Sequence, residues 1–250
     1  MKALITGASS GIGRDIAYYL ASLDIDLIIV ARRKNRLEEI KQNVTVNVQI
    51  MVMDLTIEKN IYKLYNKVKK ENVDILINNA GFGLFGVFSK TDLKRELKMI
   101  NLNIKAYHIL TKLFLINFEK RNRGYIMNVA SAAGFLSGPR INTYYATKNY
   151  ILKLTMAIYE ELRQNKKNVH ISILCPGPVN TEFNKVAQGT FKTKGADSSY
   201  VAKYAIDKMF KNKLIIIPEF KTKIGIFFSR FLPYKIMLRK MYRFQKRKTD

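Results

Sequence analysis

The sequence is poor in several features that would point to particular classes of protein. It has one cysteine, Cys175, so no disulfide can form within the chain. Its first residues, "MKALITGASSG", reach a glycine turn at Gly7 before any long apolar run, and we expect them to form a first strand and not a signal peptide. No window offers the roughly 18 uninterrupted apolar residues of a membrane-spanning helix. These absences predict a protein of a reducing compartment, which we expect to be the cytoplasm.

Acidic residues are also few. The sequence holds 19 Asp and Glu against 44 Lys and Arg, a formal net charge of +25. An excess of this size attracts nucleic acids or anionic membrane surfaces, but it also arises when lysines simply cover solvent-exposed helix faces. Because the excess is spread along the chain without a nucleic-acid-binding motif, we expect no specific nucleic-acid partner.

Clusters of metal-binding side chains are missing too. The two histidines, His108 and His170, have no Cys or carboxylate near them at ligand spacing. We expect both to be structural or surface residues, and Cys175 to be a small core residue. No metal site is predicted.

The residues that are present alternate between two patterns. Short runs rich in Ile and Val, such as "IDLIIVA" and "VDILIN", are separated by longer amphipathic stretches such as 57–70 and 92–118. Continuous apolar strands separated by helices are typical of a buried parallel sheet covered on both faces. The sequence therefore predicts an α/β fold, a Rossmann-type doubly wound parallel sheet of about seven strands. We expect one domain over residues 1–218, followed by a C-terminal extension over 219–250.

A glycine turn follows the first predicted strand. The stretch "TGASSGIG" places Gly7, Gly11 and Gly13 between that strand and the helix that follows. A strand that turns tightly into a helix presents free N–H groups and the positive end of the helix dipole, which suits a pyrophosphate. The placement predicts a dinucleotide-binding turn.

The end of the second predicted strand carries basic residues where NAD-binding folds carry an acid. "ARRKNR" offers Arg32 and Arg33, whose guanidinium groups pair with a phosphate, and Arg14 is expected near the same pocket. Alternatively, Arg33 and Arg36 are only the solvated first turn of the next helix. We interpret the pattern as a preference for NADP(H) over NAD(H).

One tyrosine and one lysine have the spacing of a proton donor and a neighbouring ammonium group. Tyr144 and Lys148 are i and i+4, so they share one face of the helix that begins near residue 141. A carbonyl reduced by hydride needs a proton, and a nearby ammonium group lowers the pKa of a phenol toward neutrality. Tyr145, at i+3 from the lysine, competes for this role on spacing alone.

Six motifs in order make the sequence resemble the short-chain dehydrogenase/reductase family, and in particular a bacterial branch whose chains end in a basic, apolar extension. They are "TGASSGIG" at 6–13, "NNAG" at 78–81, "NIKA" at 103–106, "NVAS" ending at Ser131, Tyr144-x-x-x-Lys148 and "PGPVNT" at 176–181.

The resemblance implies a role for each matching residue. Tyr144 would be the proton donor, Lys148 would hold the nicotinamide ribose, Ser131 the substrate oxygen, and Asn103 a water of a proton relay. Asp54 would hold the adenine, and Val179 and Thr181 the carboxamide. The cofactor-binding residues implied are Gly7, Ser9, Ser10, Gly11, Ile12, Gly13, Arg32, Arg33, Asp54, Asn79, Ala80, Gly81, Tyr144, Lys148, Pro176, Gly177, Val179 and Thr181. The family usually has a small residue at Tyr145, which we therefore expect to serve packing or an oligomer face.

The segments expected over the substrate are apolar. Phe82, Phe85, Phe135 and Leu136 favour a small hydrophobic carbonyl compound over a sugar. The loop of about 182–199 contains glycine and basic residues and is interpreted as a mobile lid. Lys185, Lys192 and Lys194 either meet an anionic group of the substrate or are simply solvated.

The extension 219–250 combines basic and large apolar residues. On a helix after Pro233, one side would carry Tyr234, Met237, Leu238, Met241 and Tyr242, and another Lys235, Arg239, Arg243 and Arg247. This is the pattern of an amphipathic helix at a membrane surface, which would place the protein at the inner face of the membrane. The alternative is a terminal helix pair that packs on the domain or on a partner subunit.

Two classes of function fit these features. The first is an NADP-dependent oxidoreductase that transfers hydride between nicotinamide and a hydrophobic ketone, a 3-oxoacyl-type substrate or the corresponding alcohol. The second is a non-catalytic NADP(H)-binding sensor on the same fold, which would be expected to lose the acid or its lysine. The family resemblance also implies a homo-oligomer.

Overall fold

The computed structural model describes residues 1–189 and 195–246. Within them, seven parallel strands form one sheet in the order β3-β2-β1-β4-β5-β6-β7. The strands are β1 (Lys2–Thr6), β2 (Asp26–Ala31), β3 (Val48–Val52), β4 (Ile75–Asn78), β5 (Gly124–Val129), β6 (Val169–Leu174) and β7 (Ile215–Ile216). The predicted fold class is confirmed. The strand order reverses beside β1, and an open sheet of this kind binds ligands where its order reverses.

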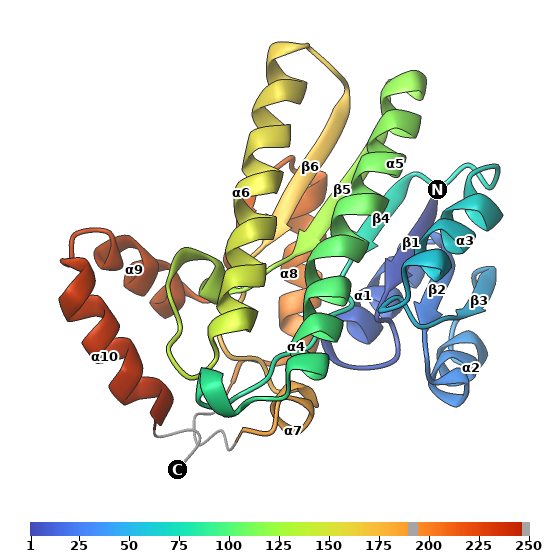
Figure 1. The fold of residues 1–250 in the computed structure, drawn as a ribbon. Helices are drawn as coiled ribbons and strands as arrows, with labels where there is room; N and C mark the ends of the chain where they lie inside the picture. The colour runs from blue at the N-terminus through green and yellow to red at the C-terminus, as the bar shows by residue number, and fades with distance from the viewer. Residues whose placement is uncertain (190–194, 247–250) are drawn as a thin grey trace.

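Helices cover both faces of the sheet (Figure 1). One face packs against α1 (Gly11–Ala21), α2 (Lys34–Gln42) and α8 (Ser198–Phe210) through a buried cluster that includes Ile16, Leu37 and Val201. The other face packs against α3 (Glu58–Val68), α5 (Tyr107–Arg121) and α6 (Asn142–Gln164), with Ile61, Phe114 and Leu162 in the core. Central strands such as β1 are buried on both sides, which explains their unbroken runs of apolar residues.

The long helix predicted over 92–118 is interrupted. It begins as α4 (Leu93–Ile100), widens into a π-helical turn η2 (Asn101–Ala106), and continues as α5. Single π-helical turns within α-helices are frequent at functional sites. This turn contains Asn103, so the departure from regular geometry occurs at a residue already implicated in the site.

Short helical segments complete the body of the protein. They are η1 (Phe88–Lys90), η3 (Ala132–Phe135) and α7 (Phe183–Val186). The last two follow the carboxyl ends of β5 and β6, where they border the site described below.

The described part of the C-terminal extension, residues 219–246, contains two helices that follow β7. Helices α9 (Phe220–Ser229) and α10 (Tyr234–Lys246) form a hairpin that projects from the body, beyond η3 and α6 (Figure 1). The boundary after Pro218 stays a prediction, and it falls between β7 and α9. In the described ranges, no helix is both long and apolar enough to cross a lipid bilayer.

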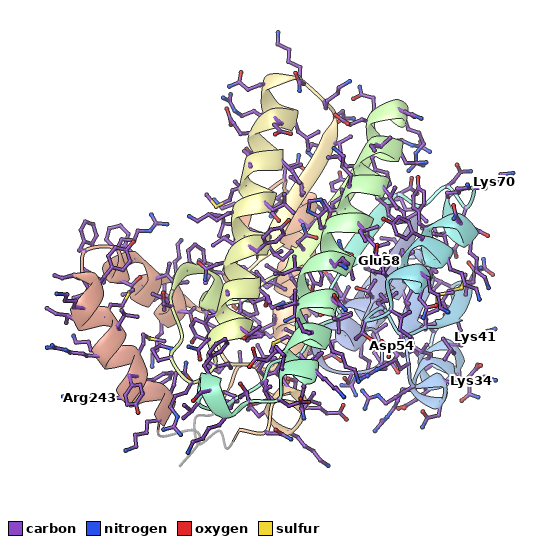
Figure 2. The ribbon with its side chains drawn as sticks, in the orientation of Figure 1. Lys34, Lys41, Asp54, Glu58, Lys70 and Arg243 are labelled. Carbon is purple, nitrogen blue, oxygen red and sulfur yellow. The ribbon has the colours of Figure 1, made fainter. Side chains whose placement is uncertain are left out.

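The helix predicted after Pro233 is present as α10, and the apolar residues expected on one side of it differ in burial. Met237 is 7% exposed and points into the protein, whereas Tyr234 is 78% exposed. Leu238 and Tyr242 are exposed as well. Arg243 points away from the body (Figure 2), and Arg247, expected on the basic side, lies outside the described residues.

Candidate active site

A cavity of about 570 Å³ lies at the carboxyl ends of the strands. All predicted cofactor residues except Gly13 line it, as do Ser131, Phe82, Phe85 and Leu136. The carboxyl ends of parallel strands meet at one edge of a sheet, so residues far apart in the sequence converge here.

The glycine turn is shaped by close backbone contacts. Gly7 has φ +68°, a conformation that favours glycine, and a Cβ on it would lie 2.7 Å from the Ala80 Cα. A Cβ on Gly13 would lie 2.2 Å from the Asn79 Nδ2 and 2.5 Å from the Gly7 carbonyl oxygen. Gly13 therefore serves the packing of the turn and lies behind the cavity wall, while Gly7 keeps the wall open.

The "NNAG" motif at the end of β4 stabilises this turn by hydrogen bonds. The Thr6 hydroxyl accepts hydrogen bonds from the backbone N–H groups of Asn79 (2.9 Å) and Ala80 (3.1 Å). The side-chain amide of Asn79 donates to the carbonyl oxygens of Thr6 and Gly7, both at 3.1 Å. These bonds join the ends of β1 and β4, which fixes the floor of the cleft.

Arg33 bridges the two sides of the cleft. Its guanidinium donates to the Glu182 carboxylate at 2.8 Å and to the Ser9 hydroxyl at 3.1 Å. The pair is nearly half exposed on both sides, and Arg33 lowers the pKa of the Glu182 carboxyl. Arg32 also lines the cavity, whereas Arg14, expected near the same pocket, pairs with Asp15 at 3.0 Å and lies outside the lining.

Asp54 lines the cleft between the end of β3 and the start of α3 (Figure 2). It is half-buried, and its carboxylate accepts a hydrogen bond from the Thr56 N–H at 2.9 Å. The bond orients the carboxylate and leaves its other oxygen for a ligand.

Ser131, Tyr144 and Lys148 come together on the opposite wall. Tyr144 and Lys148 project from the first turns of α6, and Lys148 Nζ lies 5.7 Å from the centroid of the Tyr144 ring. Ser131 caps η3 and hydrogen-bonds the Tyr144 hydroxyl. The Tyr144 ring also packs on Phe183 of α7, with 5.1 Å between ring centroids.

Burial dominates the protonation of this group. It raises the pKa of Tyr144 above its ordinary value of 10, against the lowering effect of the Ser131 hydrogen bond. Burial also lowers the pKa of Lys148 to about 8. The expected lowering of the Tyr144 pKa toward neutrality is wrong for the groups of the chain alone, because the cost of burying a phenolate sets the direction of the shift.

Asn103 is fully buried behind the cavity wall. Its amide donates to the Phe82 carbonyl oxygen at 2.9 Å and to the Thr147 hydroxyl at 3.1 Å, and its Oδ1 accepts from the Phe82 N–H. A Cβ on Gly81 would lie 3.1 Å from the Asn103 Oδ1 and 3.5 Å from Lys148 Nζ. Asn103 thus lies near the lysine, and its part in a relay stays a prediction.

Tyr107 is a site residue that the motifs did not indicate. Its hydroxyl donates to the Val129 carbonyl oxygen (3.2 Å), which also accepts from Lys148 Nζ (2.8 Å). The Tyr107 ring centroid lies 5.3 Å from that ammonium nitrogen, and the ring is buried. Tyr107 therefore helps to hold the ammonium group of Lys148 in position, through the shared carbonyl oxygen and through its ring. In the sequence, Tyr107 lies four residues after Asn103, and this helical spacing was the one feature that could have linked it to the site.

The apolar side of the cavity differs from the prediction at one residue. Phe82, Phe85 and Leu136 line it, but Phe135 does not. Phe135 instead packs on the core cluster that contains Ile151 and Leu152. The 3₁₀ turn of η3 directs adjacent residues to opposite sides, which the sequence pattern does not reveal.

The C-terminal helix supplies lining residues that sequence reasoning missed. Met241, Phe244 and Gln245 of α10 face the cavity. The Gln245 side-chain amide donates to the Tyr145 hydroxyl at 2.7 Å, and Gln245 is 1% exposed. Tyr145 therefore has a partner one hundred residues away in the sequence, which no local motif could have indicated.

The predicted lid is anchored where the structure describes it. The Ala187 carbonyl oxygen accepts from the Phe85 N–H at 3.0 Å, and a guanidinium nitrogen of Arg95 donates to the Val186 carbonyl oxygen. Lys185 is exposed. Lys192 and Lys194, expected in the same loop, lie outside the described residues.

Comparison with known proteins places this geometry in a family. The family model for short chain dehydrogenases matches residues 1–190. An NADP-dependent 3-hydroxy acid dehydrogenase of Schizosaccharomyces pombe is 32% identical over 90% of this chain and 85% of that protein. Among solved structures, a short-chain dehydrogenase from Sphingobium yanoikuyae in complex with NADPH is 28% identical, with a TM-score of 0.82 over 88% of each chain.

A second solved structure is similar over a comparable share of the chain. The bulky-bulky ketone specific alcohol dehydrogenase from Comamonas testosteroni is 26% identical, with a TM-score of 0.79 over 92% of this chain and 91% of that one. On the strength of the family match and the shared fold, the chain belongs to the short-chain dehydrogenase family of oxidoreductases.

Proposed function

We propose that the protein is an NADPH-dependent oxidoreductase that reduces an apolar ketone or 3-oxoacyl-type carbonyl, or oxidises the corresponding alcohol. The observation that carries this proposal is the convergence of Ser131, Tyr144 and Lys148 on the wall of the dinucleotide cleft. Each is a chemically suitable group, and the three come from two elements, β5 with its following turn and α6.

The geometry supports a division of labour among these side chains. A bound NADPH supplies the hydride. Ser131 donates to the carbonyl oxygen and keeps Tyr144 oriented, and Tyr144 gives its proton to the oxygen that becomes the hydroxyl. Lys148 is held by the Val129 carbonyl oxygen, from where it can bind the ribose hydroxyls of the cofactor. Asn103 would hold a water that returns the proton, and its burial near Lys148 supports this role.

The cleft fits a nicotinamide dinucleotide. The turn at Gly7 leaves room that a Cβ would fill, and helix α1 begins at Gly11 with its free N–H groups directed at the cleft. The Asp54 carboxylate lies where it can accept from an adenine amino group. Arg33, Ser9 and Arg32 together offer donors for a 2′-phosphate, and no carboxylate follows β2 to bind the ribose hydroxyls. This supports NADP(H) over NAD(H).

The substrate side supports an apolar compound. Phe82, Phe85, Leu136 and Phe183 provide hydrophobic walls near Tyr144. The relatives from Schizosaccharomyces pombe and Comamonas testosteroni act, by their names, on 3-hydroxy acids and bulky ketones. The sensor alternative is disfavoured, since the acid, its lysine and its serine are all present and line the same cavity.

The proposal is tested by NADPH oxidation against a panel of carbonyl compounds that includes long-chain 3-oxoacyl thioesters and aryl ketones. We expect turnover with NADPH that exceeds turnover with NADH, and a product alcohol formed in equal amount to the cofactor consumed. NADPH binding without consumption by any carbonyl in the panel would favour the sensor.

We further propose that the outer face of the α9–α10 hairpin contacts an anionic membrane surface, in keeping with a cytoplasmic protein at the inner face of the membrane. Phe220, Phe228 and Phe231 are 74%, 61% and 71% exposed. They are interspersed with exposed basic residues: Lys221, Lys223, Arg230, Lys235, Arg239 and Lys240. Large aromatic side chains among cations are typical of interfacial binding, and each cation near an anionic surface adds about 1 kcal/mol.

Flotation with phosphatidylglycerol vesicles tests this contact. A variant with Phe228→Ser and Phe231→Ser should stay with the unbound fraction, while Val52→Ser, exposed on β3 far from the hairpin, should float like the native protein. Equal flotation of all three proteins would remove the membrane proposal.

A homo-oligomer remains part of the proposal. Leu93, Leu97, Ile116 and Tyr150 are exposed apolar residues on α4, α5 and α6, with Leu93 at 67%. Such a face suits a second copy of the chain. Light scattering is the measurement that decides it, with a monomer as the contrary result.

A further inference from the structure

The amide of Gln245 is an unusual group in the wall of the cavity. The residue is 1% exposed, its nitrogen is bonded to Tyr145, and its oxygen Oε1 has no hydrogen-bond partner among the described residues. An unpaired buried polar atom is costly, commonly about 1–3 kcal/mol, so native structures rarely keep one without a use. Because Gln245 lines the cavity, a ligand in the cavity is the partner that can relieve this cost.

The neighbouring tyrosine complements this atom. Tyr145 accepts the hydrogen bond from Gln245 Nε2 at 2.7 Å, so its own O–H remains free to donate. The pair therefore presents one acceptor and one donor side by side. Turning the amide over exchanges the two roles and still leaves one donor and one acceptor. A hydroxyl group both donates and accepts, and so it satisfies both atoms at once.

The position of the pair relative to the reacting end restricts the ligand. The rings of Tyr144 and Tyr145 are 6.2 Å apart between centroids, and both residues line the same cavity. Met241 and Phe244 of α10, together with Ile141, add apolar surface beside the pair. A molecule that places its carbonyl at Tyr144 thus has an apolar body and reaches Gln245 with its other end.

We propose that Gln245 and Tyr145 form a subsite that binds a hydroxyl group of the substrate, at a distance from the reacting carbonyl on an otherwise apolar molecule. Gln245 is a specificity-determining residue contributed by the C-terminal extension, and Tyr145 both positions it and completes the subsite. The proposal rests on the proposed function for the place of the carbonyl, but not for the hydrogen bonds of the subsite.

The alternative is a purely structural role, in which the Tyr145–Gln245 hydrogen bond only anchors α10 to the body. An anchor would influence all ligands alike, whereas a subsite distinguishes molecules that carry the hydroxyl from those that lack it. A site built to bond a hydroxyl discriminates strongly against the analogue without it, because its own polar atoms are left unpaired.

The test measures binding and not turnover. Pairs of 4-alkylacetophenones that differ only in a terminal hydroxyl, with alkyl chains of increasing length, are titrated into the full-length protein loaded with NADP⁺, which cannot reduce them. At the chain length that spans the cavity, we expect the hydroxylated member to bind about tenfold or more tightly than its partner.

The variants then separate the subsite from an anchor. Gln245→Met keeps the length of the side chain and should reduce the preference to about one, and Tyr145→Phe should weaken it. Tyr150→Phe removes a hydroxyl from the same helix, where it bonds His108 at the surface, and should leave the preference unchanged. A hydroxyl preference that survives in Gln245→Met, or none at any chain length in the native protein, would overturn the proposal.

The same titrations keep the two proposals apart. If the preference is present but NADPH reduces none of the ketones that bind, the subsite stands and the proposed reaction fails. If the ketones are reduced with no difference within each pair, the reaction stands and the subsite fails.

Discussion

The two sides of the cavity are built in different ways. The cofactor side consists of the turns at the ends of β1, β2, β3, β4 and β5 together with the first turns of α6, which carry Tyr144 and Lys148, and hydrogen bonds to the backbone cross-link these turns. The substrate side consists of α7, η3 and α10, and α10 is joined to Tyr145 by the side chain of Gln245. Members of a family share one reaction, which needs a fixed geometry, but they differ in substrate, so the residues that contact the substrate must be free to vary.

The difference has an energetic side as well. The cofactor side accepts the cost of a buried Lys148 and of a buried phenol, because both groups must lie where the carbonyl is reduced. On the substrate side, the amide oxygen of Gln245 is buried without a hydrogen-bond partner among the described residues. Changes on the cofactor side should therefore alter the chemistry for every substrate, and changes on the substrate side should alter the choice among substrates.

The two neighbouring tyrosines give the sharpest form of this comparison. Tyr144→Phe should lower kcat by about 10²- to 10⁴-fold with every carbonyl, because the proton donor is lost, and should leave NADPH binding intact. Tyr145→Phe should leave kcat for small ketones without a hydroxyl within a few-fold. Steady-state kinetics of both variants test this difference. An equal loss of kcat in the two variants would contradict the distinction between the cofactor side and the substrate side.

The second prediction concerns Arg33. Arg33→Ala should raise the KM for NADPH about 10- to 100-fold and leave that for NADH nearly unchanged, because a charged hydrogen bond to the 2′-phosphate contributes about 1.5–3 kcal/mol. Arg36→Ala is the matched control, since Arg36 is exposed on the same helix and pairs with Glu39. If the two variants had the same cofactor preference, Arg33 would have no part in it.

The third prediction concerns the stability cost of Lys148. Its pKa in the folded protein is about 8, below its ordinary value of 10.5, because the side chain is buried. The unfolded chain therefore holds this proton more tightly, so the cost to stability is complete below about pH 8 and fades as the pH rises toward 10.5. Lys148→Met should stabilise the cofactor-free protein by about 1–3 kcal/mol at pH 7, with a smaller gain at pH 9.5.

Urea unfolding at the two pH values measures this gain. Lys153→Met, on the exposed side of the same helix, serves as the control and should change stability little at either pH. A Lys148→Met protein that is less stable than the native one at pH 7 would show that the bond to the Val129 carbonyl oxygen outweighs desolvation.

The smallest effect is expected on the substrate side. Met241→Ala removes apolar surface from the cavity wall and should raise the KM for bulky ketones about threefold to tenfold, with kcat little changed. Leu238→Ala, one turn earlier on the outer face of α10, should leave both constants unchanged. Identical kinetics of the two variants would mean that α10 does not contact the substrate.

The cofactor side was also the side that the sequence predicted well. Its residues lie in short motifs directly after strands, so the period of the strands locates them, as with Gly7, Asn79 and Ser131. Lys148 and Tyr144 share a helix face, and their contact follows from helix geometry.

The remainder depended on tertiary packing. Gln245 and Tyr145 meet across a hundred residues, and nothing in the local pattern of either indicates the other. The apolar side of α10 followed from its sequence, but the sequence did not show that Met237 is buried, that Met241 lines the cavity and that Tyr234 stays exposed, because this depends on how the hairpin packs on the body. The rise in the pKa of Tyr144 likewise comes from burial, a property of the folded state that residue spacing does not contain.

The central claim is that hydride passes from NADPH to a carbonyl with Tyr144 as proton donor. It is tested most directly with NADPH that carries deuterium at the transferable position of the nicotinamide, incubated with an apolar ketone that the protein reduces. The account predicts one deuterium on the carbinol carbon of the alcohol from the native protein and almost no alcohol from Tyr144→Phe. An alcohol without deuterium, or a Tyr144→Phe protein that forms labelled alcohol at the native rate, would contradict it.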